Sequence, residues 1–112
     1  MPVNAGTLWL RKELDTTAEV ASPEIQFVGV LGEVFYMRCR NQDCTFRIQV
    51  QAFGDQWDDV AEGTLPLGEL MVASIEYYMP KARVLVTPKA TVLPAVYVDI
   101  SAYGYPAVYV RS

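Results

Sequence analysis

The sequence predicts an all-β fold, an antiparallel β-sandwich of the jelly-roll or Greek-key type with eight or nine short strands. Two observations predict this class. Apolar and polar residues alternate in short runs, and residues that favour turns separate these runs. β-Branched and aromatic residues are also frequent, as they are in half-buried strands. The chain has 112 residues, the size of one domain, so we expect a single sandwich domain over residues 7–112.

The N-terminal third predicts an arm and two strands. Residues 1–6 contain little that would hold them in place, so we expect a flexible N-terminal arm. The next run, residues 7–14, alternates as a strand does, with Leu8, Leu10 and Leu14 on one side and Trp9, Arg11 and Glu13 on the other. The small polar residues 15–23 predict a loop. The apolar run 25–31 predicts a second strand, which Gly32 is expected to end.

The middle of the chain predicts a hairpin between residues 33–39 and residues 44–53. The connector, Arg-Asn-Gln-Asp at 40–43, has turn chemistry. Pairing in this register places six apolar side chains on one core-facing side: Cys39 opposite Cys44, Met37 opposite Phe46, and Phe35 opposite Ile48.

The following residues predict a turn and further strands. The acidic stretch 54–63 around Trp57 indicates a turn region. Residues 67–79 fit both a helical stripe and a strand, and the strands expected on both sides favour a strand. The remaining strands are expected at residues 82–87, 91–100 and 107–111.

The end of the chain carries a repeat, Pro-Ala-Val-Tyr-Val at 94–98 and again at 106–110. Because Val-Tyr-Val is palindromic, antiparallel pairing of the two copies opposes Tyr97 with Tyr109 and places four valines on the other face. We therefore predict a C-terminal hairpin over residues 95–111, with its turn at 101–105. Its valines would face the core, and its outer face would carry Tyr97, Asp99, Tyr109 and Arg111.

Composition argues against several classes of function. The chain has no histidine, which removes the usual general base at neutral pH and the commonest metal ligand. Its two cysteines are too few for a structural zinc site. Neither an activated nucleophile nor a phosphate-binding glycine loop is evident, so we expect no enzyme, no bound metal and no cofactor.

Charge and hydropathy bear on partners and location. The net charge of −4 argues against nucleic acid as a partner. Residues 1–79 contain five basic and twelve acidic residues, whereas residues 80–112 contain four basic residues and one acid, so oppositely charged parts could associate head to tail. The N-terminus lacks the pattern of a secretory signal, and no apolar stretch reaches the length of a membrane span. We expect a protein made in a cytoplasm, with no membrane partner.

Two candidate surfaces remain. The expected partner interface consists of Tyr97, Asp99, Tyr109, Arg111 and Trp9. Tyrosine and arginine are enriched where proteins bind each other, although an ordinary half-exposed sheet face has a similar composition. The possible glycan-binding set consists of Trp57, Asp55 and Asp58, because aromatic rings in loops stack on sugars.

The cysteines and the acidic cluster each have a structural interpretation. Cys39 and Cys44 could form a cross-strand disulfide, but two reduced thiols packed in the core suit a cytosolic protein better. The acidic cluster consists of Asp55, Asp58, Asp59 and Glu62. Its spacing does not match a calcium-binding EF-hand loop, and a solvated turn explains it better.

Two segments also carry a resemblance. In residues 46–63 an alternating strand leads into Gly54-Asp55 and then Trp57, and residues 79–86 read Met-Pro-Lys-Ala-Arg-Val-Leu-Val. Both segments resemble parts of discoidin-like, galactose-binding-type β-sandwich domains, and such sandwiches also occur among bacteriophage virion proteins. The order Gly54-Asp55 departs from the Asp-Gly order usual in that family. The resemblance implies a sandwich fold and, as expectations, sugar binding or a place in a virion.

We therefore expect a non-enzymatic structural protein that acts by assembly, such as a capsid decoration protein or another bacteriophage virion accessory. Its partners would be copies of itself, a capsid shell, or both. It would reside in the virion after synthesis in the host cytoplasm, or alternatively in the cytoplasm. A carbohydrate-binding module is the alternative function. A small enzyme would need a deep pocket that holds two carboxylates of different pKa.

Overall fold

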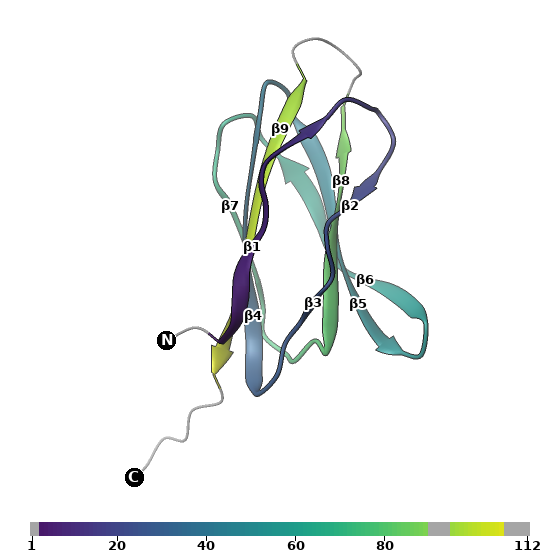
Figure 1. Ribbon diagram of the computed structural model, residues 1–112, viewed down its shortest axis with the longest axis vertical. Helices are drawn as coiled ribbons and strands as arrows, with labels where there is room; N and C mark the ends of the chain where they lie inside the picture. Colours follow the sequence, from purple (N-terminus) through teal and green to yellow (C-terminus); the bar gives the residue numbers. More distant parts are fainter. Residues whose placement is uncertain (1–2, 90–94, 107–112) are drawn as a thin grey trace.

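The computed structural model describes the backbone of residues 3–89 and 95–106. Over these ranges the chain forms nine strands in two antiparallel sheets that pack face to face (Figure 1). The strands are β1 (Val3–Leu14), β2 (Val20–Ala21), β3 (Ile25–Gln26), β4 (Val30–Arg40), β5 (Cys44–Phe53), β6 (Gln56–Leu65), β7 (Met71–Ile75), β8 (Lys81–Pro88) and β9 (Val96–Pro106). The predicted all-β antiparallel sandwich is confirmed.

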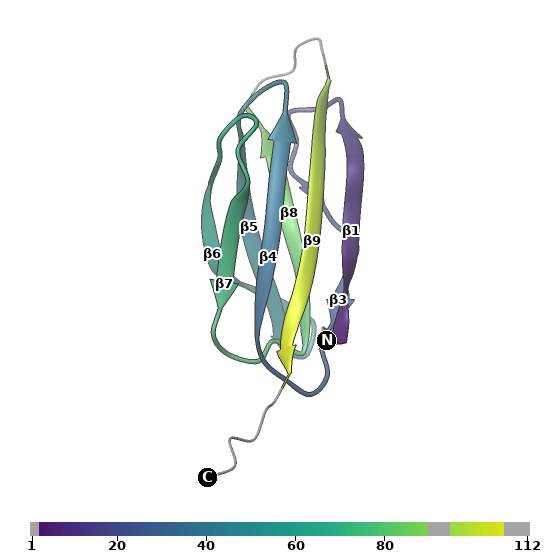
Figure 2. The same ribbon diagram turned by 90° about the vertical axis from the view of Figure 1, so that its left-hand side faces the viewer.

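The strand order identifies the type of sandwich. Sheet A has the order β1-β9-β4-β7, and Figure 2 shows these four strands side by side. Sheet B has the order β2-β8-β5-β6, with β3 also paired to β8. If β2 and β3 count as two halves of one strand, the first strand pairs with the last, the second with the second-last, and so on inward to β5 and β6. This nested antiparallel pairing is that of a jelly roll.

The hydrophobic core lies between the two sheets. Alternate residues of each strand point into it, because successive side chains on a strand point to opposite faces. On β9 the inward residues are Val96, Val98, Ile100 and Ala102, all buried, so the valines of the first repeat face the core as predicted. The rings of Phe27 and Phe35 pack edge to face there, with centroids 6.3 Å apart.

The predicted hairpin between residues 33–39 and 44–53 is wrong. Strand β4 pairs with β7 and β9 in sheet A, whereas β5 pairs with β6 and β8 in sheet B. The connector instead passes from one sheet to the other, and Asn41 takes a positive φ of 84° within it. The six apolar side chains assigned to the hairpin are nevertheless all buried. Two facing strands of opposite sheets bury the same alternate residues as a hairpin does, so the alternation fits both arrangements.

The predicted C-terminal turn is also wrong. Strand β9 continues from Val96 to Pro106, and its residues 101–105 pair with β4 on one side and partly with β1 on the other. Ala102 and Gly104 are small and buried, while Tyr103 and Tyr105 point outward, so the segment fits a central strand. Residues 107–112, which include all of the second repeat except Pro106, lie outside the described residues.

Backbone pairing corrects two expectations near the N-terminus. Residues 3–6 are not a free arm, because β1 begins at Val3 and pairs from there with β9. Residues 1–2 lie outside the described range. Gly32 does not end a strand but lies inside β4, where a Cβ atom would collide with the carbonyl oxygen of Ile75. The glycine therefore permits the close approach of β7 to β4.

The alternation predicted for residues 7–14 fails partway along β1. Trp9 and Leu14 are both buried although five positions separate them, and Leu10 is 76% exposed. The register with β9 shifts on both sides of Trp9, and Arg11 takes a positive φ of 52°. These shifts insert extra residues into β1, which reverses the face that each following side chain takes.

Two further segments are settled by their pairing. Residues 71–75 form strand β7, which confirms the choice of strand over helix there. The acidic stretch 54–63 is mostly strand β6, and the turn itself comprises only Gly54 and Asp55. Strand β6 is an edge strand, so its polar residues face water while its backbone pairs with β5.

Candidate functional site

The outer face of sheet A concentrates tyrosine and arginine side chains. Strand β9 is central in this sheet, and its outward residues lie opposite those of β4 in register: Tyr97 opposite Arg40, Asp99 opposite Arg38, Ser101 opposite Tyr36 and Tyr103 opposite Val34. Val72 and Ser74 of β7 continue the face beyond β4. We call this surface the tyrosine face and define it as Tyr36, Arg38, Arg40, Leu70, Val72, Ser74, Tyr97, Asp99, Ser101, Tyr103 and Tyr105.

Contacts between the side chains hold several of the tyrosines in place. The rings of Tyr36 and Tyr103 meet edge to face, with centroids 5.9 Å apart. The hydroxyl groups of Ser74 and Tyr105 lie 2.7 Å apart and share a hydrogen bond. Both Tyr36 and Tyr105 still expose about two-fifths of their surface, 38% and 41%. A partner would therefore meet aromatic side chains that are already ordered, which lowers the entropy lost on binding.

The charges on this face are unevenly paired. The Asp99 carboxylate accepts a hydrogen bond of 2.7 Å from the backbone N–H of Arg11 and lies 3.7 Å from the guanidinium of Arg40. Arg38 lies directly opposite Asp99 in register, yet no ion pair among the described residues involves it. Its Nε atom is buried and has no hydrogen-bond partner. A β-bulge at Arg11, where β1 has an extra residue relative to β9, brings the Arg11 backbone N–H to Asp99. Asp99 therefore accepts a hydrogen bond from Arg11 and forms no ion pair with Arg38.

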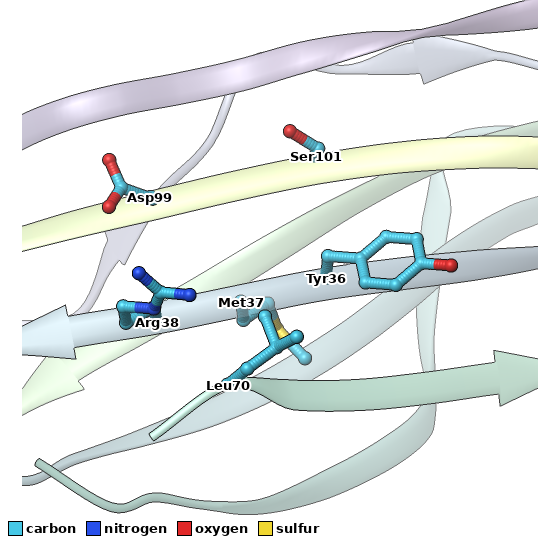
Figure 3. A pocket seen from close by; sticks show the side chains of 6 residues that line it. All are labelled: Tyr36, Met37, Arg38, Leu70, Asp99 and Ser101. Carbon is cyan, nitrogen blue, oxygen red and sulfur yellow. The ribbon is translucent and has the colours of Figure 1, made fainter. Parts of the chain in front are cut away.

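A pocket of about 210 Å³ lies beside Arg38 and Asp99 on the tyrosine face. Its lining residues are Tyr36, Met37, Arg38, Leu70, Asp99 and Ser101 (Figure 3). Figure 3 shows the Arg38 guanidinium reaching into the space between β4 and β9, with Leu70 on the other side of β4. The pocket thus combines a cation, an aromatic ring, a hydroxyl group and an exposed leucine. This combination suits an anionic group attached to an apolar one.

The structure distributes the predicted interface residues among three places. Tyr97 and Asp99 lie on the tyrosine face. Trp9 packs in the core with 7% of its surface exposed, so its ring offers little to a partner. Tyr109 and Arg111 lie outside the described residues. Sequence reasoning missed Tyr36, Arg38, Arg40, Tyr103 and Tyr105; the alternation within residues 36–40 and 97–105 was the signal that could have found them.

The predicted glycan-binding residues do not converge. The Arg83 guanidinium lies over the Trp57 ring, 4.2 Å from its centroid, and covers one ring face. Trp57 and Asp58 are adjacent on β6 and therefore point to opposite faces of the strand. Asp55 lies in the turn that precedes both.

A polar network on sheet B surrounds Trp57. Arg83 donates to Gln49, and Gln49 donates to Asp59, each at 2.8 Å. Arg47 binds both carboxylate oxygens of Asp59 at 3.0 Å and also pairs with Glu19 at 2.7 Å. Hydrogen bonds from Gln49 and Arg47 hold the pKa of Asp59 below its usual value. These groups satisfy one another, so the network stiffens sheet B and leaves few donors for a sugar.

The two cysteines are free thiols in the core. The Cys39 sulfur lies 3.2 Å from the carbonyl oxygen of Gln42 and 3.3 Å from that of Leu65. Hydrogen bonding to Cys39, together with burial, raises the pKa of the Cys44 thiol. The same hydrogen bond lowers the pKa of the Cys39 thiol. Both side chains are buried and out of reach of a reagent, so the pair acts as core packing.

Glu33 is a buried carboxyl group that the sequence did not identify. Its Oε1 atom accepts a hydrogen bond of 2.8 Å from the backbone N–H of Met79, while Oε2 is buried without a partner. Burial raises the pKa of Glu33 to about 7. The group lies on the core side of β4, beneath the connection from β7 to β8.

Other features of the described residues do not point to a function. Among the described side chains, no three histidine, cysteine or acidic residues come close enough to hold a metal ion. The described part of the chain contains no helix long and apolar enough to cross a membrane. No family model, curated protein or solved structure matches this chain. The fold and the tyrosine face are therefore the two features that bear on function.

Proposed function

We propose that this chain is a non-enzymatic structural protein that acts by assembly through the tyrosine face. The observation that carries the proposal is the combination, on one sheet face, of ordered tyrosines with Arg38, a cation that forms no ion pair with a described acid. Tyrosine and arginine are the residues that most often contribute strongly at protein interfaces. A charge without an ion-pair partner on an exposed face favours a partner of opposite charge.

We further propose that the assembly is a bacteriophage virion and that the chain is an accessory such as a capsid decoration protein. Two points support this finer proposal. The jelly roll is common among viral capsid proteins, although a fold by itself does not determine function. The sequence resemblance to sandwiches of virion proteins points the same way. The chain would then be found in the virion after synthesis in the host cytoplasm.

Co-sedimentation tests both levels of the proposal. If the genes beside this one encode a capsid protein, shells assembled from that protein would be mixed with the purified chain and pelleted. We expect the wild-type chain to pellet with the shells and the Tyr36→Ser/Arg38→Ser variant to stay in solution. Thr45→Ser, an exposed change on sheet B, is the control and should behave as the wild type. A chain that neither binds shells nor self-associates at any concentration contradicts the proposal.

A carbohydrate-binding module is the second candidate, because the pocket at Arg38 brings an aromatic ring together with several polar groups. The pocket, rather than Trp57, would then hold the sugar. A glycan array decides between the two functions. Binding of a defined glycan that is lost in Tyr36→Ala would favour the module, and an array without binding would count against it.

A further inference from the structure

The β5–β6 hairpin ends in an unusual tip. Strands β5 and β6 join through a two-residue turn, in which Gly54 takes a φ of 58°, and Phe53 pairs with Gln56 next to it. Figure 1 shows this end of the hairpin bending away from the body of the sandwich. Phe53 is 72% exposed and Asp55 is exposed, so the tip presents an aromatic ring and a carboxylate together.

The pocket on the tyrosine face has the complementary chemistry. Arg38 supplies a positive charge that forms no ion pair with a described acid, and its Nε atom is a buried donor without an acceptor. Leu70 and Val72, beside it, are 53% and 50% exposed. An aromatic ring could cover these apolar side chains while a carboxylate accepts hydrogen bonds from the guanidinium.

The aspartate in the pocket does not prevent this pairing. Asp99 already accepts a hydrogen bond from the Arg11 backbone and lies close to Arg40. Arg38, Arg40 and Asp99 together carry one net positive charge. An approaching carboxylate therefore meets a site of opposite sign.

We propose that the tip residues Phe53 and Asp55 of one copy dock into the Arg38 pocket of a second copy. The inference rests on the proposed function, because it names the occupant of part of the tyrosine face. Asp55 would pair with Arg38, and Phe53 would pack on Leu70. The tip lies at one end of the sandwich, and Arg38 lies near the opposite end, where β4 finishes (Figures 1 and 2).

The contact joins two different patches, so each copy keeps a free tip or a free pocket after pairing. Such heterologous contacts produce rings or open filaments rather than closed two-fold dimers. The proposal therefore predicts growth beyond the dimer, with a size that rises with concentration unless a ring closes.

Charge reversal tests the contact by sedimentation velocity. We expect Arg38→Glu and Asp55→Arg each to weaken self-association on the order of tenfold or more. An equimolar mixture of the two variants should associate again. Asp55 of the Arg38→Glu copy meets Arg38 of the Asp55→Arg copy, and the two introduced residues also form a pair of opposite charge, so both contacts between unlike copies can form. The double variant should associate again, because its reversed charges still match.

Matched controls separate this contact from general charge effects. Lys12→Glu reverses an exposed charge on β1, and Asp58→Arg reverses one on the same hairpin; both should associate as the wild type does. Phe53→Ser tests the apolar part of the contact, the packing of Phe53 on Leu70, and should weaken association with no change in charge. Circular dichroism would verify that every variant keeps the β-sandwich.

The outcomes also distinguish this inference from the proposed function. Loss of association in Arg38→Glu but not in Asp55→Arg overturns the tip as the occupant. A wild-type chain that stays monomeric, or variants that fail to complement each other, overturns the inference as well. Shell binding that persists in any of these cases leaves the proposed function standing.

Discussion

Glu33 makes the stability of this protein depend on pH in an unusual direction. Its side chain is fully buried, and only one of its two oxygens has a hydrogen-bond partner, the backbone N–H of Met79. Removing a carboxylate from water penalises its charged form, so the folded protein holds the proton more tightly than the unfolded chain does. Ionising Glu33 therefore favours unfolding.

The magnitude follows from the two pKa values. Burial raises the pKa of Glu33 from the ordinary 4.5 to about 7 in the folded protein. Below the lower value both states are protonated and the full stability is present. Between the two values the unfolded state releases the proton and the folded state keeps it, so stability falls as pH rises. At about 1.36 kcal/mol per pKa unit, the loss amounts to about 3 kcal/mol.

Glu33→Gln removes this dependence while keeping the contact. The glutamine carbonyl can still accept a hydrogen bond from the Met79 backbone N–H, but the side chain cannot ionise. We expect the variant to be about 3 kcal/mol more stable than the wild type at about pH 8, and to differ little from it at about pH 4. Urea unfolding followed by tryptophan fluorescence measures the free energy of unfolding at both pH values, because Trp9 moves from the core into water.

Glu76→Gln is the control, since this exposed glutamate lies in the same connection between β7 and β8. This variant should leave the pH dependence of the free energy of unfolding unchanged. A wild-type free energy of unfolding that stays constant or rises between about pH 5 and 8, or a Glu33→Gln profile that falls as steeply as the wild type, would refute the reasoning.

Two other predictions concern packing and the thiols. Gly32→Ala should lower the free energy of unfolding by about 1–3 kcal/mol, because the added methyl group collides with the Ile75 carbonyl. Gly6 has open space around it, so Gly6→Ala should change the free energy of unfolding by less than about 1 kcal/mol. If urea unfolding shows the same loss of free energy in both variants, the close approach of β7 to β4 is contradicted. Cys39 and Cys44 should resist a thiol reagent in the folded protein and react fully in denaturant, which absorbance reports. Reaction at equal rates in both conditions, or a mass two hydrogens short under non-reducing conditions, would show exposed or oxidised cysteines.

The candidate site could be predicted only in part. Alternation places Tyr97 and Asp99 on an outer face, and the structure agrees. The same pattern does not show that Asp99 is held by the Arg11 backbone, because the bulge in β1 depends on pairing with β9. Nor does it show that Arg38 forms no ion pair with a described acid, since its pocket neighbours outside β4 are Leu70 and two residues of β9, which are distant in the sequence.

The sequence by itself determined the class of fold and the core-facing side of most strands; β1 is an exception, because its register shifts change which side chains point inward. Alternation contains that information because successive side chains of a strand point to opposite faces, and only the face toward the core requires apolar residues. Only the tertiary structure decided which strands pair. Residues 35–39 and 44–48 bury the same side chains whether they form a hairpin or lie in opposite sheets. The choice between these arrangements rests on backbone hydrogen bonds to β7, β9, β6 and β8, which no local pattern contains.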